Sequence, residues 1–167
     1  VNNAGVGYFG LVESTPPEEV RRLFDVNVLG VIHGMQAVLP VMRRQRRGHI
    51  ITVASIVGQR ATPGSGAYAG AKSAVIALSE ALRLEVESAG IAVSIVYPVS
   101  TATEFFQVAG ERSSLRWGPT PPVYSPDAVA ARILECARRP RVEVMIHRPA
   151  RALAALNAIA PRLVDRL

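Results

Sequence analysis

The chain has 167 residues, of which 49% are hydrophobic and 19% charged, and a formal net charge of +6. This length and composition predict one globular domain over residues 1–167 and exclude a disordered chain. A lone cysteine, Cys136, excludes a disulfide framework, and the three histidines lie far apart, so we expect no metal site. No apolar run appears long enough to span a bilayer and VNNAGVGYFG is not a targeting segment, so we expect a soluble, cytoplasmic protein.

One interpretation of the positive charge is nucleic-acid binding. The densest basic run, RRQRR at residues 43–47, follows an apolar-periodic segment and directly precedes Gly48. That order is typical of a helix C-terminus, where cations face the helix dipole. No aromatic residues alternate with the arginines, so we expect no nucleic-acid partner.

The first part of the chain alternates between helical and strand patterns. Residues 17–42 carry apolar side chains three and four places apart and predict a helix, in which Pro40 introduces a kink or an early end. Residues 48–55 are short, apolar and β-branched, which indicates a buried strand. An alanine-rich periodic segment predicts a helix over residues 66–88, and a second buried strand follows over residues 91–98.

The second part begins with a stretch that lacks clean periodicity. Residues 99–125 contain glycines, prolines and aromatic residues, which favour a loop with short helical pieces. A helix with a serine cap is predicted over residues 125–139, and a strand over residues 141–147. The tail, residues 149–167, is apolar at helical spacing and interrupted by Pro161, so we expect a helical tail that packs on the core, on a partner chain or on a membrane surface.

Strands that alternate with helices of this length predict a parallel sheet covered on both faces, a three-layer α/β/α arrangement. Ligands bind such sheets beyond the carboxyl ends of the strands. Three segments follow strands here: Asn2 to Gly5, Ser55, and Pro98 to Thr103. We expect them to meet at one rim.

The only lysine, Lys72, lies four places after Tyr68 in a predicted helix, so the two side chains share one helix face. A free tyrosine titrates near 10, too weak an acid for efficient proton exchange at neutral pH. An ammonium about 4 Å away, at an effective dielectric near 20, favours the phenolate by about 4 kcal/mol, which lowers the pKa by roughly 3 units before desolvation is counted. Tyr68 could then exchange a proton with a carbonyl oxygen that Ser55 also contacts.

Each of these residues also has a purely structural interpretation: a core aromatic for Tyr68, a solvated lysine for Lys72 and a strand-end cap for Ser55. With 4 tyrosines in 167 residues, the spacing to the lysine arises by chance in about 2% of such sequences. For Asn27, an asparagine within DVNVLG, the structural alternative is a hydrogen bond to its own helix backbone.

The combination of NNAG, Asn27, Ser55 and the YxxxK spacing, in this order, resembles the short-chain dehydrogenase/reductase family over nearly the whole chain. The resemblance implies a Rossmann-like, doubly wound parallel sheet and an oxidoreductase that interconverts a ketone or aldehyde and an alcohol with NAD or NADP. It makes Tyr68 the catalytic acid/base, Lys72 the residue that lowers its pKa and binds the nicotinamide ribose, and Ser55 the residue that orients the substrate oxygen. Asn27 is similar to the family asparagine that holds a water in the proton relay.

The same resemblance implies the cofactor contacts. Besides Tyr68 and Lys72 they are Asn3, Ala4, Gly5, Pro98, Val99, Thr101 and Thr103. Thr103 matches the family threonine and Thr101 is the next candidate, whereas Val99 stands where the family usually has glycine. Residues 104–125 would form most of a substrate lid, whose aromatic and apolar side chains suggest an apolar pocket: Phe105, Phe106, Leu115, Trp117 and Tyr124.

The family's glycine-rich turn for the pyrophosphate, TGxxxGxG, is not found in the chain. GVGYFG at residues 5–10 follows NNAG and precedes a loop, so it is rejected as that turn. The chain is therefore interpreted as the C-terminal part of a family member, an incomplete sheet without its N-terminal strands. The alternative function is a non-catalytic fragment or regulatory binding module that retains the fold. The resemblance also implies a homo-oligomer.

Overall fold

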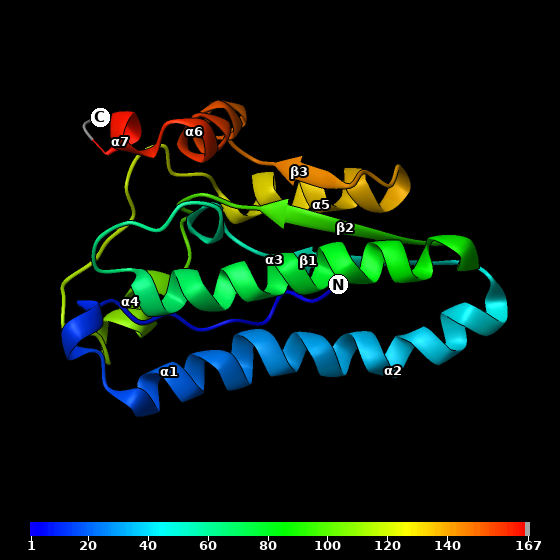
Figure 1. Cartoon of the computed structure of the whole chain (residues 1–167), viewed down its shortest axis with the longest axis horizontal. Helices are drawn as coiled ribbons and strands as arrows, with labels where there is room; N and C mark the ends of the chain where they lie inside the picture. Colours follow the sequence, from blue (N-terminus) through cyan, green and yellow to red (C-terminus); the bar gives the residue numbers. More distant parts are fainter. Residues whose placement is uncertain (166–167) are drawn as a thin grey trace.

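The computed structural model describes residues 1–165, and Figure 1 shows its layered arrangement. The helices are α1 (Pro17–Phe24), α2 (Gly30–Gln45), α3 (Gly66–Val86), α4 (Phe105–Gly110), α5 (Pro126–Arg138), α6 (Arg148–Ile159) and α7 (Pro161–Val164). The strands are β1 (Gly48–Val53), β2 (Ile91–Tyr97) and β3 (Glu143–Met145). Shorter helical turns cover Val12–Ser14, Ile56–Gly58 and Glu87–Ala89, and a π-helical turn, Asp25–Leu29, joins α1 to α2.

The three strands form a parallel sheet in the order β1-β2-β3. Thr52 of β1 lies opposite Ile95 of β2, and Ile95 lies opposite Glu143 of β3. On the free side of β1, Asn2 makes a parallel bridge with Thr52. All of these strands therefore end at one rim, where the segments predicted to carry the site begin.

Alternating side chains of the strands enter two separate cores. Ile50 and Ile95 pack with residues of α1, α2 and α3, whereas Ile51 and Val96 pack with residues of α5. This division follows from the period of two in a strand, which sends successive side chains to opposite faces. The predicted α/β fold, a parallel sheet between helical layers, is confirmed (Figure 1).

The helix predicted over residues 17–42 is longer and less regular than expected. It contains the π-helical turn and continues past Pro40 to Gln45, so of the two outcomes expected at Pro40, a kink or an early end, the early end does not occur. Met42, beyond the proline, still packs against the core, and this tertiary contact favours continuation of the helix. The helix then ends at Arg46, which adopts a left-handed φ of 49°, so the arginine run does mark a helix C-terminus.

In the second part of the chain, the Ser125 cap of α5 is confirmed, since its Oγ accepts a hydrogen bond from the Ala128 N–H at 3.2 Å. Of the strand predicted over residues 141–147, the structure forms only the central part, β3. The helical tail is confirmed through residue 164, with Pro161 beginning α7. Residues 166–167 of the predicted tail lie outside the described part.

The helical run Pro17–Gln45 has 29 residues and a mean hydropathy of 1.3 over its most apolar window, enough by length and composition to cross a membrane. The expectation that no such run exists is therefore not confirmed. One helix of this kind is weak evidence for a span, because core helices pass the same test. Here Val31 and Met35 of the run are buried against the sheet core.

Candidate active site

A cleft of about 1320 Å³ opens where β1 and β2 end. Ten of the eleven site residues predicted from the sequence line it: Asn3, Ala4, Gly5, Ser55, Tyr68, Lys72, Pro98, Val99, Thr101 and Thr103. They come from three segments that follow strand ends and from α3, which carries Tyr68 and Lys72, and the fold brings all four to one rim. The eleventh, Asn27, lies behind the cleft.

Lys72 is buried, with 5% of its surface exposed, and its Nζ donates a hydrogen bond to the Val53 carbonyl at 3.0 Å. Val53 is the last residue of β1, so this bond fastens α3 to the end of that strand. Burial lowers the pKa of Lys72 from 10.5 to about 8, because desolvation disfavours the charged form. At neutral pH the side chain is still predominantly an ammonium, with donors left over for a ligand.

Tyr68 lies one helical turn before Lys72 and opens onto the same cleft. The Lys72 Nζ is 5.9 Å from the centre of its ring. Burial raises the pKa of Tyr68 to about 12, while a hydrogen bond with Ser55 acts in the opposite direction. The predicted lowering of this pKa was therefore wrong for the structure as it stands: burial, which the sequence argument left out, raises the pKa more than the hydrogen bond with Ser55 lowers it. At neutral pH Tyr68 is a phenol that can give a proton.

Ser55 follows β1 and begins the turn Ile56–Gly58, where its Oγ accepts a hydrogen bond from the Val57 N–H at 3.4 Å. The Ile56 N–H bonds to the Pro98 carbonyl at 3.1 Å, which joins the loops after β1 and β2. Ser55 is thus both a strand-end cap and a neighbour of Tyr68, so its structural and chemical interpretations are compatible.

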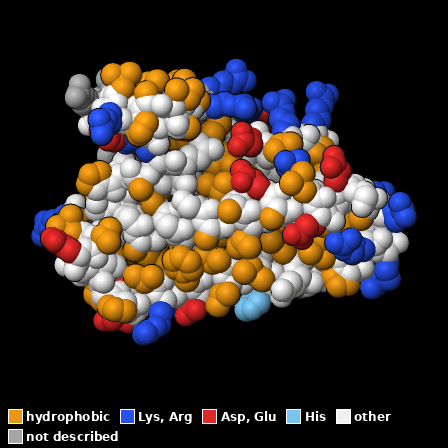
Figure 2. Space-filling view, viewed as in Figure 1, with side chains coloured by type: hydrophobic (Ala, Val, Ile, Leu, Met, Phe, Trp, Pro, Cys, Tyr) orange, Lys and Arg blue, Asp and Glu red, His pale blue; other side chains and the backbone are white. Residues whose placement is uncertain are grey.

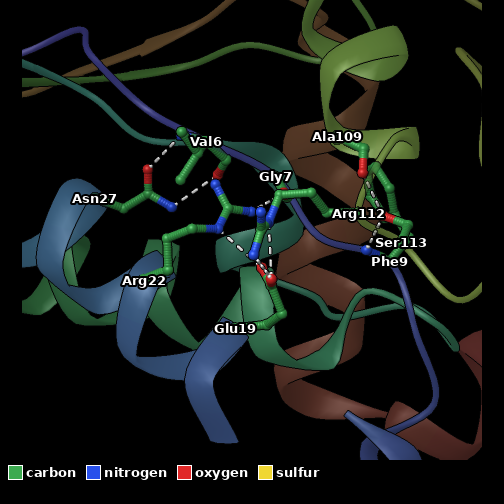
Figure 3. A network of polar contacts seen from close by, with 9 residues as sticks. All are labelled: Val6, Gly7, Phe9, Glu19, Arg22, Asn27, Ala109, Arg112 and Ser113. Atoms are coloured by element: carbon green, nitrogen blue, oxygen red, sulfur yellow. Dashed lines mark hydrogen bonds and ion pairs between the residues drawn. The ribbon is translucent and has the colours of Figure 1, made fainter. Parts of the chain in front are cut away.

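Asn27 is fully buried in the π-helical turn and makes paired hydrogen bonds with Val6, accepting from its N–H and donating to its carbonyl, both at 2.9 Å (Figure 3). Its side chain therefore bonds to a distant segment and not to its own helix. A Cβ at Gly5 would lie 2.9 Å from Asn27 Oδ1, closer than real Cβ contacts allow, so glycine is needed there. Asn27 holds the NNAG segment in place against the end of the sheet.

The segment after β2 uses its hydroxyls locally. Thr101 Oγ1 donates to the Val99 carbonyl at 3.0 Å, and Thr103 Oγ1 accepts from the Phe105 N–H at 3.3 Å, just at the start of α4. Val99 has no left-handed φ, since within residues 1–165 Arg46 is the non-glycine residue that adopts one. Valine in place of the family glycine is therefore compatible with this backbone.

An aromatic wall, defined as Phe9, Phe105, Phe106 and Trp117, lines the cleft beside Tyr68. The Phe9 ring is stacked between Trp117, at 5.2 Å between ring centres, and Phe106, at 6.1 Å. Its centre is 6.3 Å from that of Tyr68.

Three members of this wall were predicted from the sequence, but Phe9 was missed. Its position shortly after NNAG was the only indication that it could lie near the site. Leu115 and Tyr124, also predicted to line the pocket, do not line the cleft. Tyr124 instead bonds to His147, with 3.1 Å between Oη and Nδ1.

The family model described as short chain dehydrogenase matches residues 1–113, more than half of the chain. The chain therefore belongs to the short-chain dehydrogenase/reductase family.

Two curated relatives match the chain along its whole length. An uncharacterized oxidoreductase, YxnA of Bacillus subtilis, is 35% identical over 100% of this chain and 48% of its own length. Dehydrogenase/reductase SDR family member 7B of Bos taurus is 33% identical over 100% of this chain and 53% of its own length. The chain thus spans about half the length of these relatives.

Solved structures agree with the fold. A short-chain dehydrogenase/reductase of Burkholderia phymatum in complex with NAD is 26% identical, with a TM-score of 0.83, over 97% of this chain and 65% of that one. An alcohol dehydrogenase of the archaeon Thermococcus sibiricus, complexed with 5-hydroxy-NADP, is 28% identical, with a TM-score of 0.72, over 86% of this chain and 60% of that one.

The burial of Lys72 predicts an unusually low pKa for its ammonium. Because Lys72 is the only lysine in the chain, this pKa can be measured without overlap from other lysines. With lysine labelled with ¹⁵N, we expect its side-chain nitrogen to titrate near pH 8 in the folded protein and near 10.5 in denaturant. Because the folded pKa lies below the unfolded one, the unfolded state binds the extra proton between these values, so stability should rise with pH across that window.

The Lys72→Met variant assigns the NMR signal and should lose this rise in stability. A folded-state midpoint above pH 10 would contradict the burial of the ammonium.

Proposed function

We propose that this protein is an oxidoreductase that interconverts a ketone or aldehyde and an alcohol with NAD or NADP. The observation that carries the proposal is the cleft shared by Ser55, Tyr68 and Lys72, a hydroxyl, a phenol and an ammonium on one rim of a parallel sheet. The names of the relatives, oxidoreductases and dehydrogenases, and the nicotinamide cofactors of the solved structures support the same chemistry.

The residues present fit a nicotinamide cofactor. Lys72 has donors left after its bond to Val53, and Gly5 brings backbone close to that ammonium, since a Cβ there would lie 3.5 Å from Nζ. We infer that Lys72 and Tyr68 hold the nicotinamide ribose. The backbone around the NNAG segment and Val99 would line the rest. When bound, the nicotinamide supplies or accepts the hydride.

The proton chemistry belongs to Tyr68. At neutral pH its phenol holds the proton that the oxygen of a carbonyl substrate needs, but a pKa of about 12 makes it a weaker acid than free tyrosine, so donation depends on stabilisation of the phenolate. Ser55, which lines the cleft together with Tyr68, would orient the substrate oxygen. Lys72 contributes a positive charge that stabilises the phenolate left behind. We further propose that Asn27, through its grip on Val6, maintains the backbone beside Lys72 where a relay water would bind.

The substrate side of the cleft favours an apolar group next to the carbonyl. The aromatic wall borders Tyr68 directly, and aromatic side chains stabilise apolar and aromatic groups by burial and stacking. Arg22, a charged residue of the cleft lining, is already paired with Glu19. We therefore propose aryl or alkyl ketones, aldehydes or alcohols as the substrate class.

We also propose that the protein forms a homo-oligomer through the outer surface of α2 and α3. In Figure 2 hydrophobic side chains gather over this part of the molecule. Large apolar residues exposed on these two helices are Val38 and Val41 of α2 and Leu84 of α3. Apolar side chains concentrated on one surface are typical of an interface between subunits.

The proposed role of Tyr68 predicts that removal of its phenol oxygen slows turnover. The change Tyr68→Phe should lower kcat by about 10²–10⁴-fold, since the proton donor is lost, while NADH or NADPH binding, measured by fluorescence titration, stays within a few-fold. Assays should use the protein together with any residues encoded ahead of Val1.

The matched control is Tyr124→Phe, which removes a hydroxyl outside the cleft and should leave kcat within about twofold. Unchanged turnover of Tyr68→Phe would refute the assignment and favour a non-catalytic binding module.

The proposed substrate class predicts a selective change in the aromatic wall. Trp117→Ala should raise KM for aryl ketones by about tenfold, because the stacked face beside Phe9 is lost, and should change KM for a three- or four-carbon ketone by less than about twofold. Steady-state kinetics with both substrates provides the control within one variant. Equal effects on the two substrates would contradict an apolar binding role for the wall.

The proposed interface predicts that a charge placed in it lowers the mass of the particle in solution. By sedimentation velocity we expect the unmodified protein to be an oligomer and Leu84→Glu to shift it toward monomer, since a charge would be buried in the interface. Val142→Glu changes a similarly exposed residue just before β3 and should leave the mass unchanged. A monomeric unmodified protein would disprove the proposal.

A further inference from the structure

Glu19 of α1 is a buried carboxylate, with 7% of its side chain exposed, and it pairs with Arg112 of the lid, residues 104–125 (Figure 3). It accepts hydrogen bonds from Arg22 Nε and from Arg112 Nε, both at 2.8 Å, and forms a further ion pair with Arg112 Nη2. A carboxylate removed from water is costly unless it is paired, and here two cations compensate it.

The first cation connects Glu19 to the cleft. Arg22 Nη2 donates to the Gly7 carbonyl at 2.9 Å, and the preceding residue, Val6, is held by Asn27 (Figure 3). Both Val6 and Gly7 line the cleft. We call residues 2–9, which run from NNAG to Phe9 of the aromatic wall, the cleft strip. Two successive residues of the cleft strip are thus hydrogen-bonded to side chains of the helical layer.

The second cation connects Glu19 to the lid. Arg112 lies directly before Ser113, whose Oγ accepts a hydrogen bond from the Phe9 N–H at 2.8 Å (Figure 3). The Leu115 N–H then donates to the Phe9 carbonyl at 3.1 Å. The lid therefore bonds both the N–H and the carbonyl of Phe9, close in sequence to Arg112, which pairs with Glu19.

The lid also rests closely on this strip. A Cβ at Gly7 would lie 2.7 Å from Phe105 Cζ and 2.9 Å from Ala109 Cβ, so α4 approaches the backbone at a distance that only glycine permits. Phe106 and Trp117, both lid residues, stack on the two faces of Phe9. The position of the lid therefore sets the shape of the aromatic wall.

From these contacts we propose that Glu19 is a positioning residue: through Arg112 and Arg22 it latches the lid to the cleft strip and holds the aromatic wall in its substrate-binding shape. The structural half of this inference stands by itself, and its effect on turnover rests on the proposed function. Glu19 touches no reacting atom, since it acts through the two arginines.

The latch is ionic at neutral pH. The hydrogen bond from Arg112 lowers the pKa of Glu19 below 4.5, with Arg22 acting in the same direction and burial opposing both. Because the folded pKa lies below the unfolded one, the stabilisation is present above about pH 4.5 and is lost as the pH falls through the lower folded value.

The test is hydrogen exchange of the backbone amides of residues 105–117, followed by mass spectrometry at neutral pH. Arg112→Gln should accelerate exchange there by about tenfold, because the lid opens more often without the ion pair. Arg112 has 55% of its side chain exposed, so this variant keeps the core intact even if Glu19→Gln fails to fold. Arg112→Lys retains a cation at this position and should remain close to the unmodified protein.

Arg116→Gln is the matched control, since it removes a lid arginine for which no ion pair occurs in the described part of the chain. Exchange of the lid should be unchanged in this variant. The proposal is overturned if Arg112→Gln leaves exchange unchanged, or if Arg116→Gln accelerates it equally.

Kinetics separates this proposal from the proposed function. With an aryl ketone, Glu19→Gln and Arg112→Gln should each raise KM by about three- to tenfold with kcat within twofold, and the double variant should be no worse than Glu19→Gln alone. An additive double variant would overturn the latch. If the unmodified protein turns over no carbonyl substrate, the proposed function fails, while the exchange experiment still decides the latch.

Discussion

A buried ammonium bonded to the last carbonyl of a strand is the interaction on which the site depends. Lys72 donates to Val53 and so pins α3 across the end of β1. Tyr68, one turn earlier, is thereby carried into the cleft, and Gly5 fits beside the nitrogen. The interaction has a cost, visible in the pKa of Lys72, which burial lowers to about 8. Arginine would not serve here, because its broad planar head does not fit where a compact ammonium reaches one carbonyl and still has donors to offer.

Around this point the molecule uses buried polar groups to hold loops, because loops at the end of a sheet have few ladder hydrogen bonds of their own. Asn27 forms hydrogen bonds with both the N–H and the carbonyl of Val6, and Arg22 donates one to the carbonyl of the next residue, Gly7. Glu19 then joins Arg22 to the lid. The helical side of the rim is thus held by buried hydrogen bonds, whereas residues 104–125 are attached through an ion pair whose arginine is partly exposed to solvent. In the proposed function, such an attachment would let residues 104–125 open to admit a substrate and close to exclude water.

Much of the fold could be predicted from periodicity, and the failures have physical causes. The helices at residues 66–88 and 125–139 were predicted to within two residues, because amphipathic spacing and caps are local signals. The helix does not end early at Pro40, one of the two outcomes expected there, since Met42 beyond the proline packs against the core. The pKa of Tyr68 was predicted in the wrong direction. Two residues on one helix face reveal their mutual charge but not how much water the fold removes from them, and here desolvation dominates.

By itself the sequence determined the α/β class, the order of the elements and the candidate residues at the strand ends. These follow from patterns that span a few residues and from the fact that parallel strands end at one edge. The tertiary structure alone decided that Phe9 stands between two aromatic rings of the lid, that Asn27 bonds to Val6, and that Glu19 pairs with an arginine 93 residues away. Contacts between distant segments depend on how whole elements pack, and no local pattern of side chains records that.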